Sequence, residues 1–242
     1  MTKTFDDELL TSFMSTFLGY GNLAGPIWFV GMEESGGDFE EIERRLVTWQ
    51  QRGGRQVEDC AEYHIALGLD RNFRDHKPVI QRTWRGLMLA TLAFQGRPAD
   101  REAVREFQRA EWGRSAGSVA LLELLPLPSP SISNWIYGDH SEISELETRA
   151  RYEATRVPRR MEALRALVAK HRPTAVVFYG SRYQPYWEQI VGGGFQSTDV
   201  GKVLAAPRNE TLCLSMPHPV AHGLNDEFFL SIGRLLPGGH HT

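Results

Sequence analysis

Residues 26–37 read Pro26-Ile27-Trp28-Phe29-Val30-Gly31-Met32-Glu33-Glu34-Ser35-Gly36-Gly37, and this stretch indicates the fold class. Its short apolar run is aromatic and β-branched, which predicts a buried strand rather than a helix. Two carboxylates, a serine and three glycines predict a tight polar loop at the carboxyl end of that strand. In open α/β sheets, ligands bind at this edge. The stretch therefore predicts an α/β protein with a ligand site after the strand.

Three further apolar runs predict strands, at 118–125, 174–179 and 211–216. A helix is the alternative over 118–125, because leucine and alanine favour helices. Apolar residues at helical spacing predict seven helices around these strands. Their ranges are 5–18, 38–51, 77–96, 99–112, 144–171, 183–191 and 224–236.

Strands that alternate with helices predict a parallel sheet with helices on both faces. Right-handed crossovers would place the ends of all four strands at one edge, where the loops 31–37, 125–137 and 217–224 would converge. Without repeats or a clear linker, we expect one domain over 1–242. An N-terminal helix is expected within 1–20, a turn at 19–25 and a disordered tail at 237–242.

Composition excludes several classes of protein. The chain has 242 residues, 41% hydrophobic and 24% charged, which is typical of a globular protein. A net charge of -3 gives no overall basic character for nucleic-acid binding, although local patches can act alone. With only Cys60 and Cys213, we expect no structural zinc, no iron–sulfur cluster and no disulfide framework. The cysteine usage and the lack of a signal peptide or a long apolar run predict a cytoplasmic protein without a membrane span.

The loop after the first predicted strand could bind a ligand. Gly31, Gly36 and Gly37 let the backbone approach a ligand closely, but the pattern is neither a Walker motif nor GxGxxG. Glu33 and Glu34 would repel a bare phosphate but suit the orientation of a water or of a base edge. The alternative is a plain strand-to-helix turn whose acidic residues favour the helix terminus.

The second unusual loop follows the last predicted strand. Pro217 and Pro219 hold His218 in an extended geometry. A histidine there can donate a hydrogen bond to developing negative charge. The alternative is a structural histidine that bonds to neighbouring backbone.

These two loops carry a resemblance. Gly31-Met32-Glu33-Glu34-Ser35-Gly36 resembles the first motif of the uracil-DNA glycosylase superfamily, and His218-Pro219-Val220-Ala221 resembles its second motif, His-Pro-Ser-Pro. The resemblance spans about residues 20 to 236 and implies a three-layer α/β/α fold around a four-stranded parallel sheet. It also implies a base-flipping pocket without metal or cofactor, acting on DNA or a nucleobase-containing ligand.

By this resemblance, Glu33 positions the attacking water and His218 stabilises the departing base. Glu123 matches the position of an asparagine that reads the base edge in many members, and an outward-facing strand residue is its alternative. The implied base-binding residues are Gly31, Met32, Glu34, Glu123 and Trp135, and the implied DNA-contact loop is His222, Gly223 and Leu224, with Leu224 as an apolar wedge. Trp28, Phe29 and Tyr137 are further stacking candidates, with core packing as their alternative. Candidate phosphate contacts are Arg82, Arg85, Arg114 and Arg182.

The chain departs from the family pattern at three positions. No proline follows Glu33, and Val220 replaces the serine of the second motif. An ionised Glu123 only accepts hydrogen bonds, whereas asparagine also donates. A guanine-like donor edge would suit such a carboxylate better than uracil.

The sequence thus predicts a divergent glycosylase-like hydrolase of N-glycosyl bonds. One alternative is a catalytically inactive module that binds a nucleobase or nucleic acid in the same pocket. Another is a hydrolase of an unrelated small molecule that uses Glu33, Glu34 and His218, with or without a metal. The base, the strand preference and the oligomeric state stay open.

Overall fold

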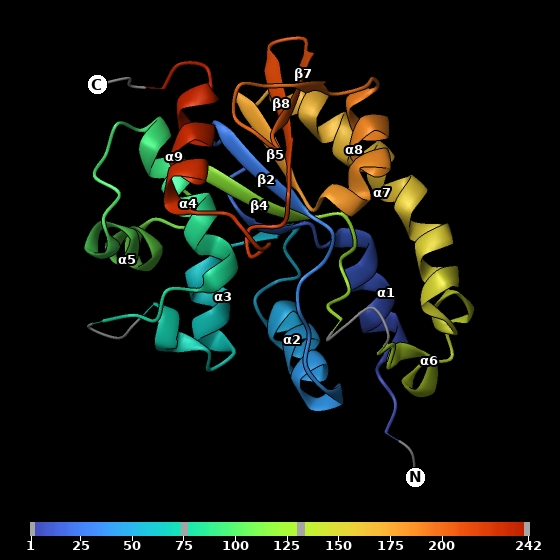
Figure 1. Ribbon diagram of the computed structural model, residues 1–242. Coiled ribbons are helices and arrows are strands. Elements are labelled where there is room, and N and C mark those ends of the chain that lie inside the picture. Colours follow the sequence, from blue (N-terminus) through green and yellow to red (C-terminus); the bar gives the residue numbers. More distant parts are fainter. Residues whose placement is uncertain (1–2, 74–76, 130–133, 240–242) are drawn as a thin grey trace.

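The computed structural model describes residues 3–73, 77–129 and 134–239, and over these residues the chain is an α/β protein with a mixed eight-stranded sheet (Figure 1). The order from one edge to the other is β3 (Val57–Glu58), β1 (Gly19–Gly21), β4 (Val119–Glu123), β2 (Ile27–Gly31), β5 (Ala175–Tyr179), β8 (Thr211–Met216), β7 (Leu204–Arg208) and β6 (Gln196–Ser197).

The four strands predicted from the sequence form the middle of this sheet. β2 pairs in parallel with β4 and β5, and β5 pairs in parallel with β8. The prediction of a sheet with only four parallel strands is wrong. β1 joins β4 and β7 joins β8, both antiparallel, and β3 and β6 extend the two edges.

The strand β1 lies where a turn was predicted. Gly19 has φ 141° and Gly21 has φ 97°, a region that L side chains rarely adopt. A Cβ on Gly19 would lie 2.0 Å from the carbonyl oxygen of Leu121 on β4. Only glycine allows this close approach, and a strand of two glycines has no alternating apolar pattern to reveal it.

Helices cover both faces of the sheet, with α4 and α9 on one side and α7 and α8 on the other (Figure 1). They are α1 (Asp7–Thr16), α2 (Phe39–Gln51), α3 (Cys60–Ala66), α4 (Arg82–Phe94), α5 (Arg101–Ala110), α6 (Tyr137–His140), α7 (Arg149–His171), α8 (Gln184–Val191) and α9 (Asp226–Leu235). Short 3₁₀ turns occupy η1 (Asp70–Asn72), η2 (Ser144–Leu146) and η3 (Ser181–Tyr183). In the described chain, none of these helices has the length and apolar character that crossing a membrane requires.

Helix boundaries follow their caps rather than the apolar pattern alone. The helix predicted over 77–96 begins at Arg82, because the Gln81 side chain accepts a hydrogen bond from the Trp84 amide at 2.7 Å. The first helix begins after Asp6, whose carboxylate accepts from the amides of Glu8 and Leu9. α7 starts after the Thr148 cap, so the predicted 144–171 helix divides into η2 and α7.

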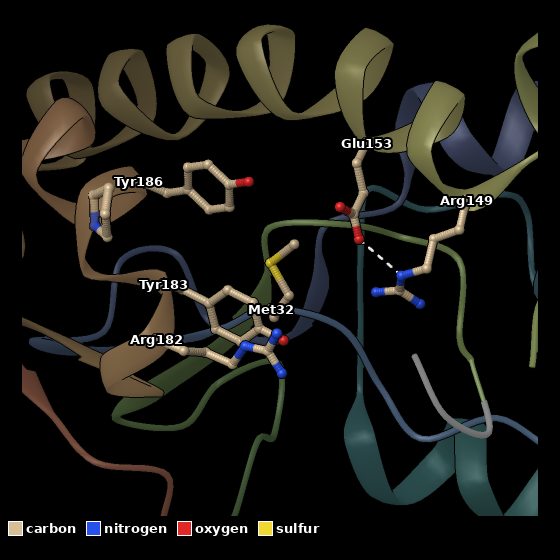
Figure 2. A pocket seen from close by; sticks show the side chains of 7 residues that line it. Met32, Arg149, Glu153, Arg182, Tyr183 and Tyr186 are labelled. Atoms are coloured by element: carbon tan, nitrogen blue, oxygen red, sulfur yellow. Dashed lines mark hydrogen bonds and ion pairs between the residues drawn. The ribbon is translucent and has the colours of Figure 1, made fainter. Parts of the chain in front are cut away.

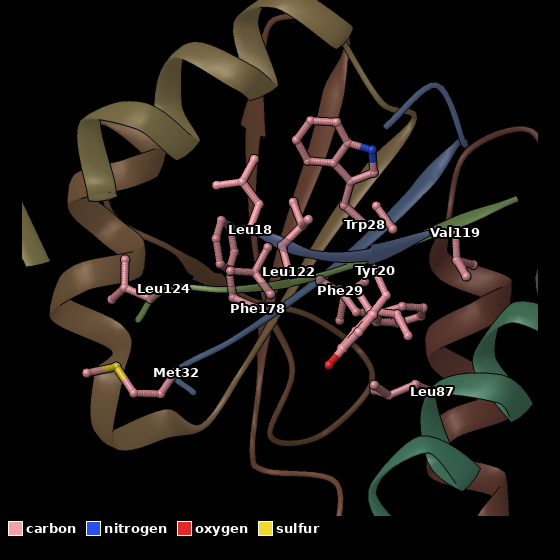
Figure 3. Packing of buried hydrophobic residues seen from close by; sticks show 14 of the residues in the cluster. Leu18, Tyr20, Trp28, Phe29, Met32, Leu87, Val119, Leu122, Leu124 and Phe178 are labelled. Atoms are coloured by element: carbon pink, nitrogen blue, oxygen red, sulfur yellow. The ribbon is translucent and has the colours of Figure 1, made fainter. Parts of the chain in front are cut away.

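The core lies on both faces of β2, and the buried apolar residues form one connected cluster (Figure 3). Trp28 packs on His171 of α7 at 5.7 Å between ring centroids, whereas Phe29 packs on Trp112 at 5.8 Å. Both side chains are buried, so neither provides a stacking platform for a ligand. The two aromatic residues hold β2 in the middle of the sheet, and this fixes the loop that follows it.

Two predicted segments are described only in part. The expected disordered tail begins with an ordered turn, in which Gly239 lies beside the backbone of Phe94. Residues 240–242, and residues 130–133 of the loop predicted over 125–137, lie outside the described part of the chain.

Candidate functional site

A cavity of about 360 Å³ lies at the carboxyl ends of β2, β4, β5 and β8. This volume is within the range of small-molecule sites. Its walls include four of the residues that the sequence singled out, Glu33, Glu34, Glu123 and His218. The rest of the lining is Ser35, Arg45, His64, Asn72, Gln81, Thr83, Trp84, Ser129 and Tyr179. The two motif loops therefore contribute side chains to one cavity.

The loop 31–36, here called the acidic loop, is held to the segment after β4 by backbone hydrogen bonds. The amides of Leu124 and Leu125 donate to the carbonyl oxygens of Gly31 and Met32 at 2.9 and 2.7 Å. Further along, a bridge joins Ser35 to Ser129. The pairing of β2 with β4 thus continues beyond the strands and holds the backbone of the acidic loop in place.

Glu33 forms an ion pair with Arg149, at the first turn of α7. Nη2 of Arg149 donates to both carboxylate oxygens, at 2.7 and 2.8 Å. The side chains are only 12% and 10% exposed. Burial raises the pKa of Glu33, and Arg149 opposes this shift by stabilising the charged form. A carboxylate with a raised pKa is a stronger base than an ordinary one, which suits proton transfer near neutral pH.

Glu34 is held from one side only. The Tyr20 hydroxyl and Nη1 of Arg45 both donate to its Oε2, at 2.8 and 3.1 Å. Arg45 also pairs with Glu41, one turn earlier on α2. These contacts fix the Glu34 carboxylate, and within the described residues no hydrogen bond to its Oε1 is found, so a water or a ligand can bind there.

Glu123, the last residue of β4, shares a hydrogen bond with the last residue of β5. The Tyr179 hydroxyl donates to its Oε1 at 3.3 Å, whereas its Oε2 is buried and has no partner in the described chain. Burial raises the pKa of Glu123 well above its usual range, and the charges of Glu34 and Glu33 add to the effect. Burial thus shifts Glu123 towards the protonated form, in which one of its oxygens can donate a hydrogen bond.

Gly31 makes room for this pair. A Cβ at this position would lie 2.3 Å from the hydroxyl oxygen of Tyr179 and 2.6 Å from Oε2 of Glu123. The glycine is therefore required by close approach, and it forms part of the floor beneath Glu123.

His218, which follows β8, lines the same cavity as the acidic loop and is exposed on one side. Its ring meets the Tyr179 ring at 5.7 Å and 71°. The amide of Val220 donates to Nδ1 at 3.4 Å, so the neutral ring carries its proton on Nε2. Partial burial lowers the pKa of His218, which favours this neutral form. The ring can then donate one hydrogen bond from Nε2.

Trp84 and His64 give the cavity an aromatic wall that sequence reasoning missed. The Trp84 ring meets the His64 ring at 5.5 Å and 90°. Nδ1 of His64 lies 2.7 Å from the carbonyl oxygen of Cys60 and donates to it, which leaves Nε2 as an acceptor. Trp84 fits the apolar period of its helix, so nothing in the local pattern indicates that it borders a site.

Several predicted residues do not line this cavity. Met32 lies in a neighbouring one, and Trp135 packs on Tyr152 while the Arg149 guanidinium lies 5.8 Å from its ring. Leu224 is half-buried against the core, which disfavours its role as a free wedge. His222 and Gly223 are exposed next to it. Of the arginines proposed for phosphate, Arg85 pairs with Asp226 and Arg114 pairs with Asp59.

Within the described residues, His, Cys, Asp and Glu side chains do not gather in any group of three that could hold a metal ion. The cavity's chemistry is that of carboxyl, imidazole, phenol and indole groups.

A scan against models of known protein families finds no match, and a search of curated proteins finds no relative.

Proposed function

We propose that this protein hydrolyses the N-glycosidic bond of a nucleobase in DNA or in a nucleotide, with a fold similar to that of the uracil-DNA glycosylases. The observation that carries the proposal is the shared cavity of Glu33, Glu123 and His218, which come from the ends of three different strands. Four parallel strands in the middle of the sheet, with helices on both faces, agree with such a fold.

The proposed reaction uses one residue from the acidic loop and one from the loop 217–224. As the bond between C1′ and the base nitrogen breaks, its electron pair leaves with the base, and Nε2 of His218 donates a hydrogen bond to the negative charge that develops. Water forms the new bond to C1′, and Glu33 accepts its proton. The products are a sugar with a free anomeric hydroxyl and a base that takes up a proton.

Glu123 would read the base edge, and its protonation state changes the substrate preference. An ionised carboxylate would favour a guanine-like donor edge. A protonated carboxyl group donates from one oxygen and accepts at the other, as an asparagine amide does. The raised pKa of Glu123 shifts the carboxyl group towards the protonated form, which would suit the mixed edge of a uracil-like base.

Base release from a panel of modified oligonucleotides, single-stranded and duplex, and from free nucleotides tests the proposal. Glu33→Gln and His218→Ala should each lower release by at least about 100-fold, and both variants should remain folded. Glu147→Gln is the matched control, because Glu147 is exposed and pairs with Arg151 outside the cavity. Glu34→Gln belongs to the same series, because the open Oε1 of Glu34 makes it the competing base. Release that is unchanged in both Glu33→Gln and His218→Ala would overturn the assignment.

A catalytically inactive nucleobase-binding module is the second candidate. One observation favours it, because both oxygens of Glu33 already accept hydrogen bonds from Arg149. This candidate predicts that a nucleobase ligand raises the thermal midpoint while no member of the panel releases its base.

A further inference from the structure

A second cavity, of about 350 Å³, lies on the other side of the acidic loop from the first. Met32 lines it, while the adjacent residue Glu33 lines the first cavity. Figure 2 shows its other walls, with Arg149 and Glu153 on α7 and Arg182, Tyr183 and Tyr186 around the start of α8. The proposed hydrolysis uses none of the residues that line this cavity.

Arg149 borders this cavity and carries a buried donor that the described chain leaves unpaired. Its Nε donates to Glu153 at 2.7 Å, and its Nη2 donates to Glu33. Its Nη1 has no hydrogen-bond partner in the described chain, and the side chain is nine-tenths buried. An unpaired buried donor is unfavourable, so a ligand oxygen that accepts from Nη1 gains a hydrogen bond that the protein alone does not make.

Two tyrosines give the cavity a flat apolar wall. The rings of Tyr183 and Tyr186 are almost parallel, at 12°, with centroids 6.4 Å apart. Both are partly exposed, and the buried side chain of Met32 lies beside them (Figure 2). Aromatic side chains stack on the face of any base, so this wall would not distinguish one base from another.

The charges decide which planar ring fits. Inside the cavity the charge of Arg149 is paired with Glu153, which also lines it, and with Glu33, which lines the first cavity. The interior is therefore balanced, which favours a neutral ring with a carbonyl oxygen over a buried anion. Arg182 is exposed at the rim, forms no ion pair within the described residues and lies 5.4 Å from the Tyr183 ring. Its guanidinium is free to bind a phosphate outside the cavity.

We propose that this second cavity is a nucleotide subsite, in which the tyrosine wall stacks on a carbonyl-bearing base, Nη1 of Arg149 donates to the base carbonyl and Arg182 binds the phosphate. The inference rests on the proposed function for the class of ligand. Because Met32 and Glu33 are consecutive, the two cavities are close enough in the chain to take neighbouring nucleotides of one strand. A free mononucleotide has the same chemistry.

Titration calorimetry with thymidine 5′-monophosphate and with a short oligothymidylate tests the subsite. Tyr183→Leu keeps an apolar side chain but removes the stacking ring, and we expect it to weaken binding about tenfold. Arg182→Ala changes only an exposed residue and should lower the salt dependence of oligothymidylate binding by about one phosphate contact. Arg159→Ala, at an exposed position of α7 outside both cavities, is the matched control and should change neither.

The two ligands separate the sources of the nucleotide. Losses for both ligands would support a site that takes a free nucleotide, and losses for oligothymidylate alone would support a site for the neighbouring nucleotide of a strand. Unchanged affinity for both ligands in Tyr183→Leu and Arg182→Ala would overturn the inference, even if the wild type releases bases. Conversely, weaker binding by these variants, together with no base release by the wild type, would support the subsite and refute the proposed hydrolysis.

Discussion

The acidic loop and the loop 217–224, here called the histidine loop, both contribute side chains to one cavity but are held very differently. In the acidic loop, Glu33 and Glu34 are fixed by Arg149, Tyr20 and Arg45. In the histidine loop, the hydrogen bonds found in the described chain are local, from the Ala221 amide to the His218 carbonyl oxygen and from the Val220 amide to the ring. The carboxylates are thus part of the packed structure, whereas the histidine is not.

This difference predicts where stability and activity separate. A substitution that breaks the support of the acidic loop should destabilise the fold, because it leaves a buried charge without a partner. A substitution of the histidine should change chemistry and leave stability nearly unaltered, because the ring is exposed on one side.

The largest effect is expected for Arg149→Met. The pair with Glu33 is almost fully buried, and loss of one partner from such a pair costs about 3–5 kcal/mol of the free energy of unfolding. Urea unfolding measures it. Arg151→Met, which breaks an exposed pair with Glu147, is the control and should cost less than about 1 kcal/mol. A cost for Arg149→Met as small as that of the control would show that the acidic loop does not depend on this pair.

The sequence did not predict which residues bind the carboxylates of the acidic loop. Strand ends at one edge of a parallel sheet bring Glu33, Glu123 and His218 together, and a pattern of apolar runs is enough to predict that. Arg149 lies 116 residues from Glu33, on a helix whose sequence resembles any amphipathic helix. No local pattern encodes such a contact, since it depends on how α7 packs against the sheet.

The same distinction applies to the fold. β5 and β8 were predicted to within one residue, because β5 is a continuous run of alanine, valine and aromatic residues and β8 is a short, mostly apolar run that ends before Pro217. β1 and β7 escaped prediction for physical reasons. β1 consists of two glycines and a tyrosine, and β7 contains Pro207, which argues against a strand in a sequence pattern.

The next effect in size is expected for His218→Ala. Loss of a donor to the departing base should lower the rate of base release by about 100- to 1,000-fold. The free energy of unfolding should change by no more than about 0.5 kcal/mol, because the ring is exposed and makes no long-range hydrogen bond in the described chain. Single-turnover base release and urea unfolding measure the two quantities. His218→Asn retains a donor and should recover part of the rate, which a purely structural role would not explain.

Gly31→Ala tests the close approach beneath Glu123. The added methyl group would meet the Tyr179 hydroxyl at 2.3 Å, and overpacking of this kind costs about 1–3 kcal/mol of the free energy of unfolding. Gly193→Ala is the matched control, because nothing lies within 4 Å of a Cβ there. Tyr179→Ala removes the two nearest atoms, the hydroxyl oxygen and Cζ, so the double variant should lose less than the sum of the two single changes. Strict additivity would contradict the proposed contact.

The smallest effect is expected for Glu123→Gln, and it distinguishes a protonated from an ionised carboxyl group. Because the folded pKa of Glu123 lies above its unfolded value, the folded state binds more protons and the stability of the wild type falls as pH rises from about 4.3 towards the raised pKa. The Glu123→Gln variant should lose less stability over this pH range. Part of the pH dependence should remain, because the pKa of Glu33 is also raised.

Base release at neutral pH should stay within about tenfold of wild type in Glu123→Gln, because glutamine and a neutral carboxyl group both donate and accept, and tenfold corresponds to about 1.4 kcal/mol. Glu123→Leu, which can do neither, should lose far more. Equal losses in Glu123→Gln and Glu123→Leu would mean that the ionised form is the one that functions. The carboxyl group at the end of β4 would then act in its charged form, as the carboxylates of the acidic loop do, and not as a neutral donor like His218.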